Sequence, residues 1–170
     1  MEKLTAAKEL LAAGDRSAIA MLEELAGREA DEVAAAAFLA IAARLRGIDV
    51  VRSLFMDPAT EPRLARLLLS NYNSDLVPDE GDVRFLVDAL GTYLDRALPW
   101  LAGLRQDVWD NGAYLILVGL THPAAIALLR SEDLATERGS LLPLLERVTG
   151  EDGDDDLLDE AAGLIEDLRR

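Results

Sequence analysis

The sequence contains no cysteine and a single histidine, His122. Without cysteine the chain can form no disulfide, carries no thiol nucleophile and offers no thiolate to a metal ion. One imidazole cannot build a multi-histidine metal site, and no serine motif accompanies it to form a Ser-His-Asp relay. His122 precedes Pro123 at the start of an expected helix, so we expect Thr121 or His122 to cap that helix rather than to act in catalysis.

Basic residues are also few. The 170 residues include 17 Lys or Arg against 32 Asp or Glu, which gives a formal net charge of -15. A chain this acidic repels a phosphate backbone, so we do not expect it to bind nucleic acid. The expected partner is another protein, and the charge favours a basic one.

Long hydrophobic runs are missing. The run from Val33 to Ala43 is eleven residues long and the run from Ala113 to Leu120 is eight, whereas a membrane-spanning helix needs about twenty. The first residues carry Glu2 and Glu9 within their apolar pattern, which is not the layout of a signal peptide. We therefore expect a cytoplasmic protein without a membrane segment, in which residues 113–120 form a buried helix.

No stretch shows the alternation typical of a β-strand, whereas apolar residues recur at helical spacing throughout. The predicted fold class is all-α, with a single domain over residues 1–170 made of about ten short helices. The expected helices cover residues 4–13, 16–27, 33–45, 48–55, 60–69, 83–90, 92–104, 108–120, 123–130, 141–148 and 157–168.

Helix boundaries are suggested by particular residue types. Gly14 and Gly91 are expected to end helices, and Asp15 and Asp31 to cap the helices that follow them. The helix over residues 33–45 is apolar around nearly its whole circumference, so neighbouring helices must cover it on more than one side.

The two halves of the chain show signs of an internal duplication. A shift of 76 aligns residues 1–75 with 77–151, with about fifteen identities over roughly sixty positions, and leaves a C-terminal helix over 154–170. The pattern Asp-x-Ala-Thr-Glu occurs at residues 57–61 and again at 133–137, each time near the start of a helix. Residues 70–82 are rich in turn formers and are the expected linker between the halves.

Successive short helices joined at Gly, Asp or Pro, with alanine-rich seams such as Asp15 to Leu45, resemble the HEAT and armadillo class of helical repeats. The resemblance covers roughly residues 15–150. It implies an α-solenoid-like stack of antiparallel helices that binds other proteins. An irregular helical bundle is the alternative architecture.

The acidic run at residues 151–156 does not match a calcium loop. Counting from Asp152, Leu157 occupies the position of the loop glycine and Gly163 that of the bidentate glutamate. The alternating oxygen-bearing side chains of residues 71–82 fail in the same way, with Leu76 at the glycine position. We expect no metal site, no cofactor and no enzymatic activity, because no glycine-rich phosphate loop or preferred carboxylate pair is present.

Six of the eight aromatic residues lie between residues 72 and 114. Tyr93 and Trp100 share one face of an expected helix that is apolar over a wide arc. The first interpretation of this face is core. If the arc is too wide to bury, the same two side chains would anchor a partner interface.

The predicted function is a non-enzymatic protein-protein interaction module, and the alternative is an acidic immunity or inhibitor protein that neutralises a basic toxin or nuclease. The candidate partner-binding residues are Tyr93, Trp100, Asp154, Asp155 and Asp156.

Overall fold

A computed structural model describes residues 2–57, 59–73, 77–101, 106–150 and 155–170. These residues form α-helices and one short 3-10 helix and contain no strand, which confirms the all-α fold class. The elements are α1 (Glu2–Ala12), η1 (Arg16–Ala18), α2 (Ile19–Arg28), α3 (Glu32–Arg46), α4 (Ile48–Met56), α5 (Pro62–Asn73), α6 (Glu80–Leu101), α7 (Gln106–Leu120), α8 (Pro123–Leu129), α9 (Ala135–Thr149) and α10 (Asp155–Arg169).

The chain divides into two compact units, unit 1 over Met1–Ser74 and unit 2 over Asp75–Arg170. The boundary lies within residues 70–82, where the sequence predicts a linker. The break between helices is shorter than predicted, because α5 continues to Asn73 and α6 begins at Glu80. Whether residues 1–170 fold as one domain, as the sequence predicts, is not tested by this division into two units.

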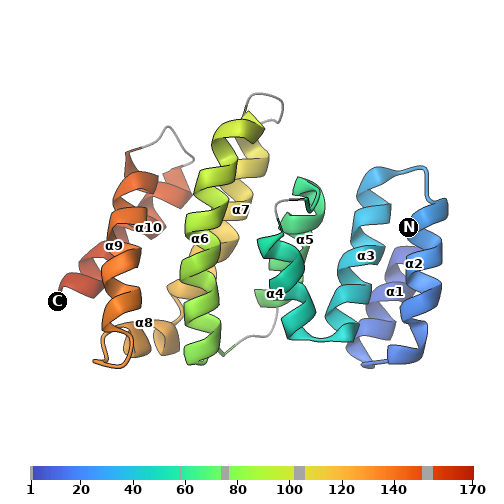
Figure 1. Cartoon of the computed structure of the whole chain (residues 1–170), viewed down its shortest axis with the longest axis horizontal. Helices are drawn as coiled ribbons and strands as arrows, with labels where there is room; N and C mark the ends of the chain where they lie inside the picture. Colours follow the sequence, from blue (N-terminus) through green and yellow to red (C-terminus); the bar gives the residue numbers. More distant parts are fainter. Residues whose placement is uncertain (1, 58, 74–76, 102–105, 151–154) are drawn as a thin grey trace. The chain divides into compact units, whose positions relative to one another are not determined.

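Unit 1 is organised around α3. This helix lies between α1 and α2 on one side and α4 and α5 on the other (Figure 1), and it packs against all four. Its apolar surface is thereby covered on more than one side, as the sequence predicts, and Phe38 is 1% exposed, although Val33 and Leu39 remain exposed. The core against α1 and α2 consists of Ala7, Ala18, Leu22, Ala26, Phe38, Ile41, Ala42 and Leu45.

The turns of unit 1 follow the capping rules read from the sequence. Gly14 has a φ of 66° and closes α1, with the Asp15 N–H donating to the Leu10 carbonyl and the Gly14 N–H donating to the Leu11 carbonyl. The Asp31 carboxylate caps α3 by accepting the Val33 N–H at 2.9 Å. Both predicted boundaries are confirmed.

Unit 2 is built from two helix pairs. Helix α6 packs against α7, α9 packs against α10, and the short α8 contacts all four (Figure 1). The fully buried side chains of this core come from every one of the five helices and include Leu86, Leu90, Ile116, Leu117, Leu120, Leu129, Leu141, Leu145 and Ala161.

Arginine side chains join the helices of unit 2 at their ends. Arg138 of α9 donates to the carbonyl of Leu129, the last residue of α8, at 2.8 Å. Arg147 of α9 reaches α6, where it bonds the Asp95 carboxylate at 2.8 Å. Arg169 of α10 bonds Glu146 of α9 at 2.5 Å. Each contact crosses between helices, so much of the unit's basic charge lies at helix junctions.

Gly91 does not break a helix, contrary to the prediction of separate helices over 83–90 and 92–104. It lies inside α6, which is continuous from Glu80 to Leu101. A Cβ at Gly91 would lie 3.6 Å from the Leu144 side chain of α9, so this position packs closely against another helix. Tertiary packing therefore overrides the low helix propensity of glycine here.

Two helix starts also lie earlier than predicted. Helix α6 begins at a reciprocal cap, in which the Asp79 carboxylate accepts the Asp82 N–H and the Asp82 carboxylate accepts the Asp79 N–H, both at 2.9 Å. Helix α9 begins at Ala135 instead of 141, and Pro143 lies inside it. The start of α6 depends on side-chain hydrogen bonds that apolar periodicity does not register, whereas the N-cap residue of α9, Leu134, makes no side-chain cap hydrogen bond.

The helix bounds of the two units correspond in part. A shift of 76 brings α3, α4 and α5 close to α7, α8 and α9, whereas α1, η1 and α2 fall on the single helix α6. The packing differs, because α3 packs against α5, whereas α7 and α9 each pack against α10. The shared Asp-x-Ala-Thr-Glu pattern also differs in place, since residues 57–61 precede α5 and residues 133–137 overlap the start of α9. The duplication stays a prediction.

Replacing Phe38 by Ala is expected to lower the free energy of unfolding by about 3–5 kcal/mol, because it leaves a cavity in the core around α3. Replacing Glu23 by Ala is expected to change it by less than about 1 kcal/mol, since its ion pair with Arg46 is solvent-exposed. Urea unfolding followed by circular dichroism measures both changes. Equal losses in the two variants would contradict the placement of Phe38.

Replacing Asp79 by Ala is expected to lower the free energy of unfolding by about 1 kcal/mol, because it removes the cap on the Asp82 N–H. Asp79→Ser is the matched control, since its hydroxyl can accept the same hydrogen bond. Hydrogen exchange of the amides in the first turns of α6 provides a local measurement. The cap is not stabilising α6 if both variants exchange like the parent protein.

Candidate functional site

Unit 2 has a groove between α7, α8 and α10, with a volume of about 450 Å³. One wall comes from α10 and contains Asp156, Asp159, Glu160, Gly163 and Asp167. The facing side comes from Tyr114 and Thr121 of α7 and Ile126 of α8. We call this the α7–α10 groove.

The acidic wall follows from the residue spacing along α10. Leu157, Ala161, Leu164 and Leu168 recur every three or four residues and are buried. The groove acids lie beside this apolar stripe at positions 156, 159, 160 and 167, so they form a neighbouring stripe on the same helix. Burial of the apolar stripe therefore fixes the direction in which the acidic stripe points.

The opposite wall has an aromatic, partly exposed surface. Ala113, Ile116, Leu117 and Leu120 of α7 are fully buried, whereas Tyr114 is 36% exposed and Val118 is 40% exposed. The expectation that residues 113–120 are buried all round is therefore wrong for one face. Helix α7 has neighbours on its other sides but leaves Tyr114 at the groove surface.

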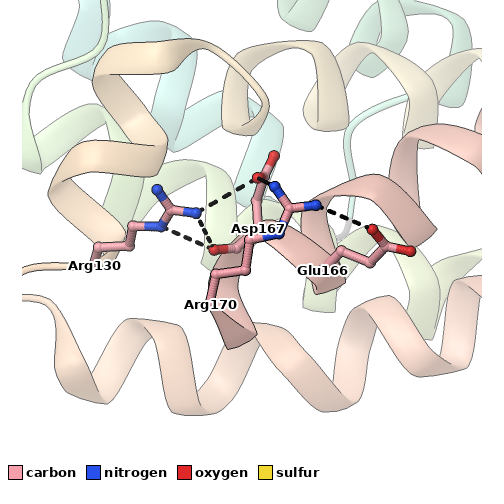
Figure 2. A network of polar contacts seen from close by, with 4 residues as sticks. All are labelled: Arg130, Glu166, Asp167 and Arg170. Atoms are coloured by element: carbon pink, nitrogen blue, oxygen red, sulfur yellow. Dashed lines mark hydrogen bonds and ion pairs between the residues drawn. The ribbon is translucent and has the colours of Figure 1, made fainter.

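At one end of the groove the acidic charge is neutralised within the protein. Figure 2 shows Arg130, which donates from Nε and Nη2 to the Asp167 carbonyl at 2.8 and 2.5 Å. Arg170 Nη1 lies 3.7 Å from the Asp167 carboxylate, and its Nη2 lies 3.4 Å from Glu166 (Figure 2). The C-terminal half of α10 thus already carries its own cations.

Two acids farther from the C-terminus of α10 have no such partner. Asp159 and Glu160 form no side-chain hydrogen bond or ion pair within the part of the chain that the structure describes. Helix α10 is therefore divided electrostatically, with paired acids near its C-terminus and unpaired acids one to two turns from its N-terminus. Acids near a helix N-terminus are also favoured by the helix dipole.

The charge of the two units differs strongly. Residues 75–170 contain 21 acidic and 8 basic side chains, a net charge of -13, whereas residues 1–74 contain 11 and 9, a net charge of -2. Almost the whole excess of negative charge is therefore carried by the unit that contains the α7–α10 groove.

Gly163 lies in the middle of the acidic wall. A Cβ at this position would meet no atom within 4 Å, so the glycine is not required by packing. Glycine inside a helix is less favourable than alanine by roughly 0.5–1 kcal/mol. Its effect on the groove is to lower the wall between Glu160 and Asp167.

Unit 1 has a smaller groove of about 330 Å³ between α3 and α5. Its floor includes Ala35, Ala36 and Leu39, and Leu39 is among the exposed large apolar side chains. An ion pair between Glu32 and Arg63 lies at its edge. The lining also includes Glu61, whose carboxylate accepts the Leu64 N–H, so the groove is only weakly negative.

The structure places the predicted site residues in different surroundings. Tyr93 is 1% exposed and belongs to the core of unit 2, which supports the core interpretation and removes it from the surface. The side chain of Trp100 and the whole of Asp154 lie outside the described residues. Asp155 and Asp156 are exposed, and only Asp156 lines the α7–α10 groove.

Apart from Asp156, the sequence analysis proposed none of the groove residues as binding residues; those missed are Tyr114, Thr121, Ile126, Asp159, Glu160, Gly163, Leu164 and Asp167. The helical spacing of 156, 159, 160, 163 and 167 is a signal that could have grouped the residues on α10. No pattern in the sequence connects them to Tyr114, because that contact arises from packing between α7 and α10.

His122 serves as the N-cap of α8, as one of the two expected caps. Its Nδ1 accepts the Ala124 N–H at 3.1 Å, and Pro123 opens the helix. In the described ranges no group of three or more histidine, aspartate or glutamate side chains is arranged to hold a metal ion.

Comparisons with known proteins identify no relative of this chain. No protein-family model matches it, and neither a curated protein nor a solved structure is significantly similar. The HEAT or armadillo assignment therefore stays a prediction, beyond the general finding of about ten packed helices. Within the described residues, no helix is both long enough and apolar enough to cross a membrane.

Proposed function

We propose that this protein is a non-enzymatic protein-binding module whose partner presents a basic surface to unit 2. The observation that carries the proposal is the concentration of charge. Unit 2 holds a net charge of -13, and the α7–α10 groove carries two acids that no described cation neutralises.

A field of this kind favours protein partners of opposite charge. Complementary charge accelerates diffusional encounter and disfavours partners of like charge. Among the acids of the groove, Asp156 and Asp159 are exposed and Glu160 and Asp167 are partly exposed, so a cation can bind them without the large desolvation cost of a fully buried charge. Tyr114 and Ile126 add apolar area next to them, as in interfaces that combine charged and aromatic contacts.

The side chains available give less support to catalysis. The one imidazole of the chain is engaged as a helix cap through Nδ1. The groove acids face Tyr114, Thr121 and Ile126, which offer neither a nucleophile paired with a base nor a cation that could stabilise developing negative charge. A binding role therefore fits this surface better than a reaction.

A finer form of the proposal is a helical-repeat scaffold. In unit 1, α2 pairs with α3 and α4 pairs with α5, and α3 packs against α5. Consecutive helix pairs that pack on one another are the building principle of α-solenoids, which bind proteins along extended surfaces. The proposal of a cytoplasmic location accompanies this form and rests on the sequence alone.

The second candidate is an acidic immunity or inhibitor protein that occupies the basic site of a toxin or nuclease. The concentration of negative charge in unit 2 favours it too, because a nuclease site is built to attract polyanions. The two candidates differ in one outcome: an inhibitor competes with nucleic acid for its partner, whereas a scaffold does not.

Changing Asp154, Asp155 and Asp156 to Lys shifts the net charge by six and is expected to slow capture of the native partner by about tenfold at low ionic strength. The association rate of the parent protein is expected to fall steeply up to about 0.15 M salt. Measurement uses the partner captured from source cells, immobilised for association kinetics.

The matched control changes Glu9, Glu24 and Asp49 to Lys, since all three are exposed in unit 1 and alter the net charge equally. We expect this control to slow capture much less. Equal slowing by both triple variants, or an association rate independent of salt, would show that a basic partner does not bind unit 2 through its charge. Loss of binding in the presence of duplex DNA would favour the inhibitor.

A further inference from the structure

We propose that the α7–α10 groove is a docking site for an arginine-containing segment of the partner. The guanidinium group would lie at Asp159 and Glu160, and the aliphatic part of the side chain would lie against Tyr114 and Ile126. This inference rests on the proposed function and adds to it the site and the chemistry of recognition.

The two walls of the groove match the two parts of an arginine side chain. The acids of α10 supply carboxylate oxygens, which a guanidinium binds through several N–H donors in a fixed planar arrangement. On α7 the partly exposed ring of Tyr114 offers a face on which the same planar group can stack. A lysine ammonium would find the carboxylates but would stack less well, because it is compact and strongly hydrated.

Within the protein, one arginine already binds α10 near its C-terminal end. Arg130 reaches α10 from the end of α8 and donates to the Asp167 carbonyl from two nitrogen atoms, at 2.8 and 2.5 Å (Figure 2). Its Nη2 also lies 3.5 Å from the Asp167 carboxylate. An arginine from another helix is therefore already bound at one end of the acidic stripe.

The other end of the stripe repeats the acids without the arginine. Glu160 lies seven residues before Asp167, which is about two helical turns along the same face. Neither Glu160 nor Asp159 has a cationic partner among the described residues. These two carboxylates can thus bind a cation from outside the described chain.

Gly163 provides access between the two ends. Because a Cβ there would meet nothing within 4 Å, the position is open to solvent above the groove. The absence of a side chain lets the backbone of a bound segment approach α10 between Glu160 and Asp167. A larger side chain at this position would fill that space without touching the core.

The groove of unit 1 does not support a comparable inference. Its edge carries both Glu32 and Arg63, which pair with each other. Nothing about its charge or shape selects one class of partner, so the α7–α10 groove is the stronger site.

The test titrates the isotope-labelled full-length protein with three amidated, alanine-rich helical peptides that differ at a few positions one turn apart. The first carries arginine at those positions, the second lysine and the third citrulline, which has the shape of arginine without its charge. We expect amide shifts in α10 and α7 around residues 114–121 and 157–164. The arginine peptide should bind several times more tightly than the lysine peptide, and the citrulline peptide should not bind.

Two pairs of variants locate the binding. Replacing Asp159 by Asn together with Glu160 by Gln should weaken the arginine peptide by about tenfold, whereas Asp155→Asn, on the same helix but outside the groove, should have little effect. Gly163→Leu should block the groove, whereas Ala162→Leu, at the adjacent exposed position, should not. Circular dichroism and thermal unfolding check that all four variants remain folded.

The inference is wrong if the arginine and lysine peptides bind equally and Asp155→Asn weakens them as much as the groove variants. It is also wrong if Gly163→Leu leaves the arginine peptide bound. In either case the proposed function survives provided that the charge reversal of residues 154–156 still slows capture of the native partner. Loss of that effect as well would remove both.

Discussion

Unit 2 has 8 basic side chains for 21 acidic ones, and the positions of those few cations determine much of its structure. Arg138, Arg147 and Arg169 lie at junctions between helices, where they bond carbonyl or carboxylate oxygens of a neighbouring helix. Arg130 and Arg170 lie at the C-terminal end of α10. Cations placed at junctions cannot also cover the rest of the surface, and Asp159 and Glu160 of α10 have no cationic partner among the described residues.

The same scarcity of cations links stability to binding. Arginine near the C-terminus of a helix interacts favourably with the helix dipole, so Arg130 has a structural reason to be where it is. At the other end, Asp155 and Asp156 lie in the first turn of α10, where the positive end of the dipole favours acids. Along the acidic stripe of α10, Asp167 is thus paired with arginine, whereas Asp159 and Glu160 have no cationic partner among the described residues. The apolar stripe of the same helix packs on the core and so orients these acids.

Much of the fold was predictable from local signals. Gly14, Asp31 and His122 mark helix boundaries through backbone conformation and side-chain hydrogen bonds, and those effects lie within a few residues of each other in sequence. Gly91 was predicted wrongly because its environment is created by Leu144, which lies more than fifty residues away. The site was harder still, since the spacing along α10 groups Asp159 with Glu160 but cannot show that α7 places Tyr114 opposite them. Tyr93 illustrates the reverse case, because a wide apolar arc on a helix indicates burial and exposure equally until the neighbouring helices are known.

The uneven division of charge between the units has a consequence for the behaviour of this protein in concentrated solution. When two copies meet, surfaces with a net charge of -13 repel each other, whereas surfaces with a net charge of -2 scarcely do. The repulsion acts over a screening length of about 8 Å at physiological ionic strength and shrinks as salt is added. The charge of unit 2 thus opposes self-association of the whole chain. Added salt is expected to weaken first the repulsion between the most acidic surfaces of two copies.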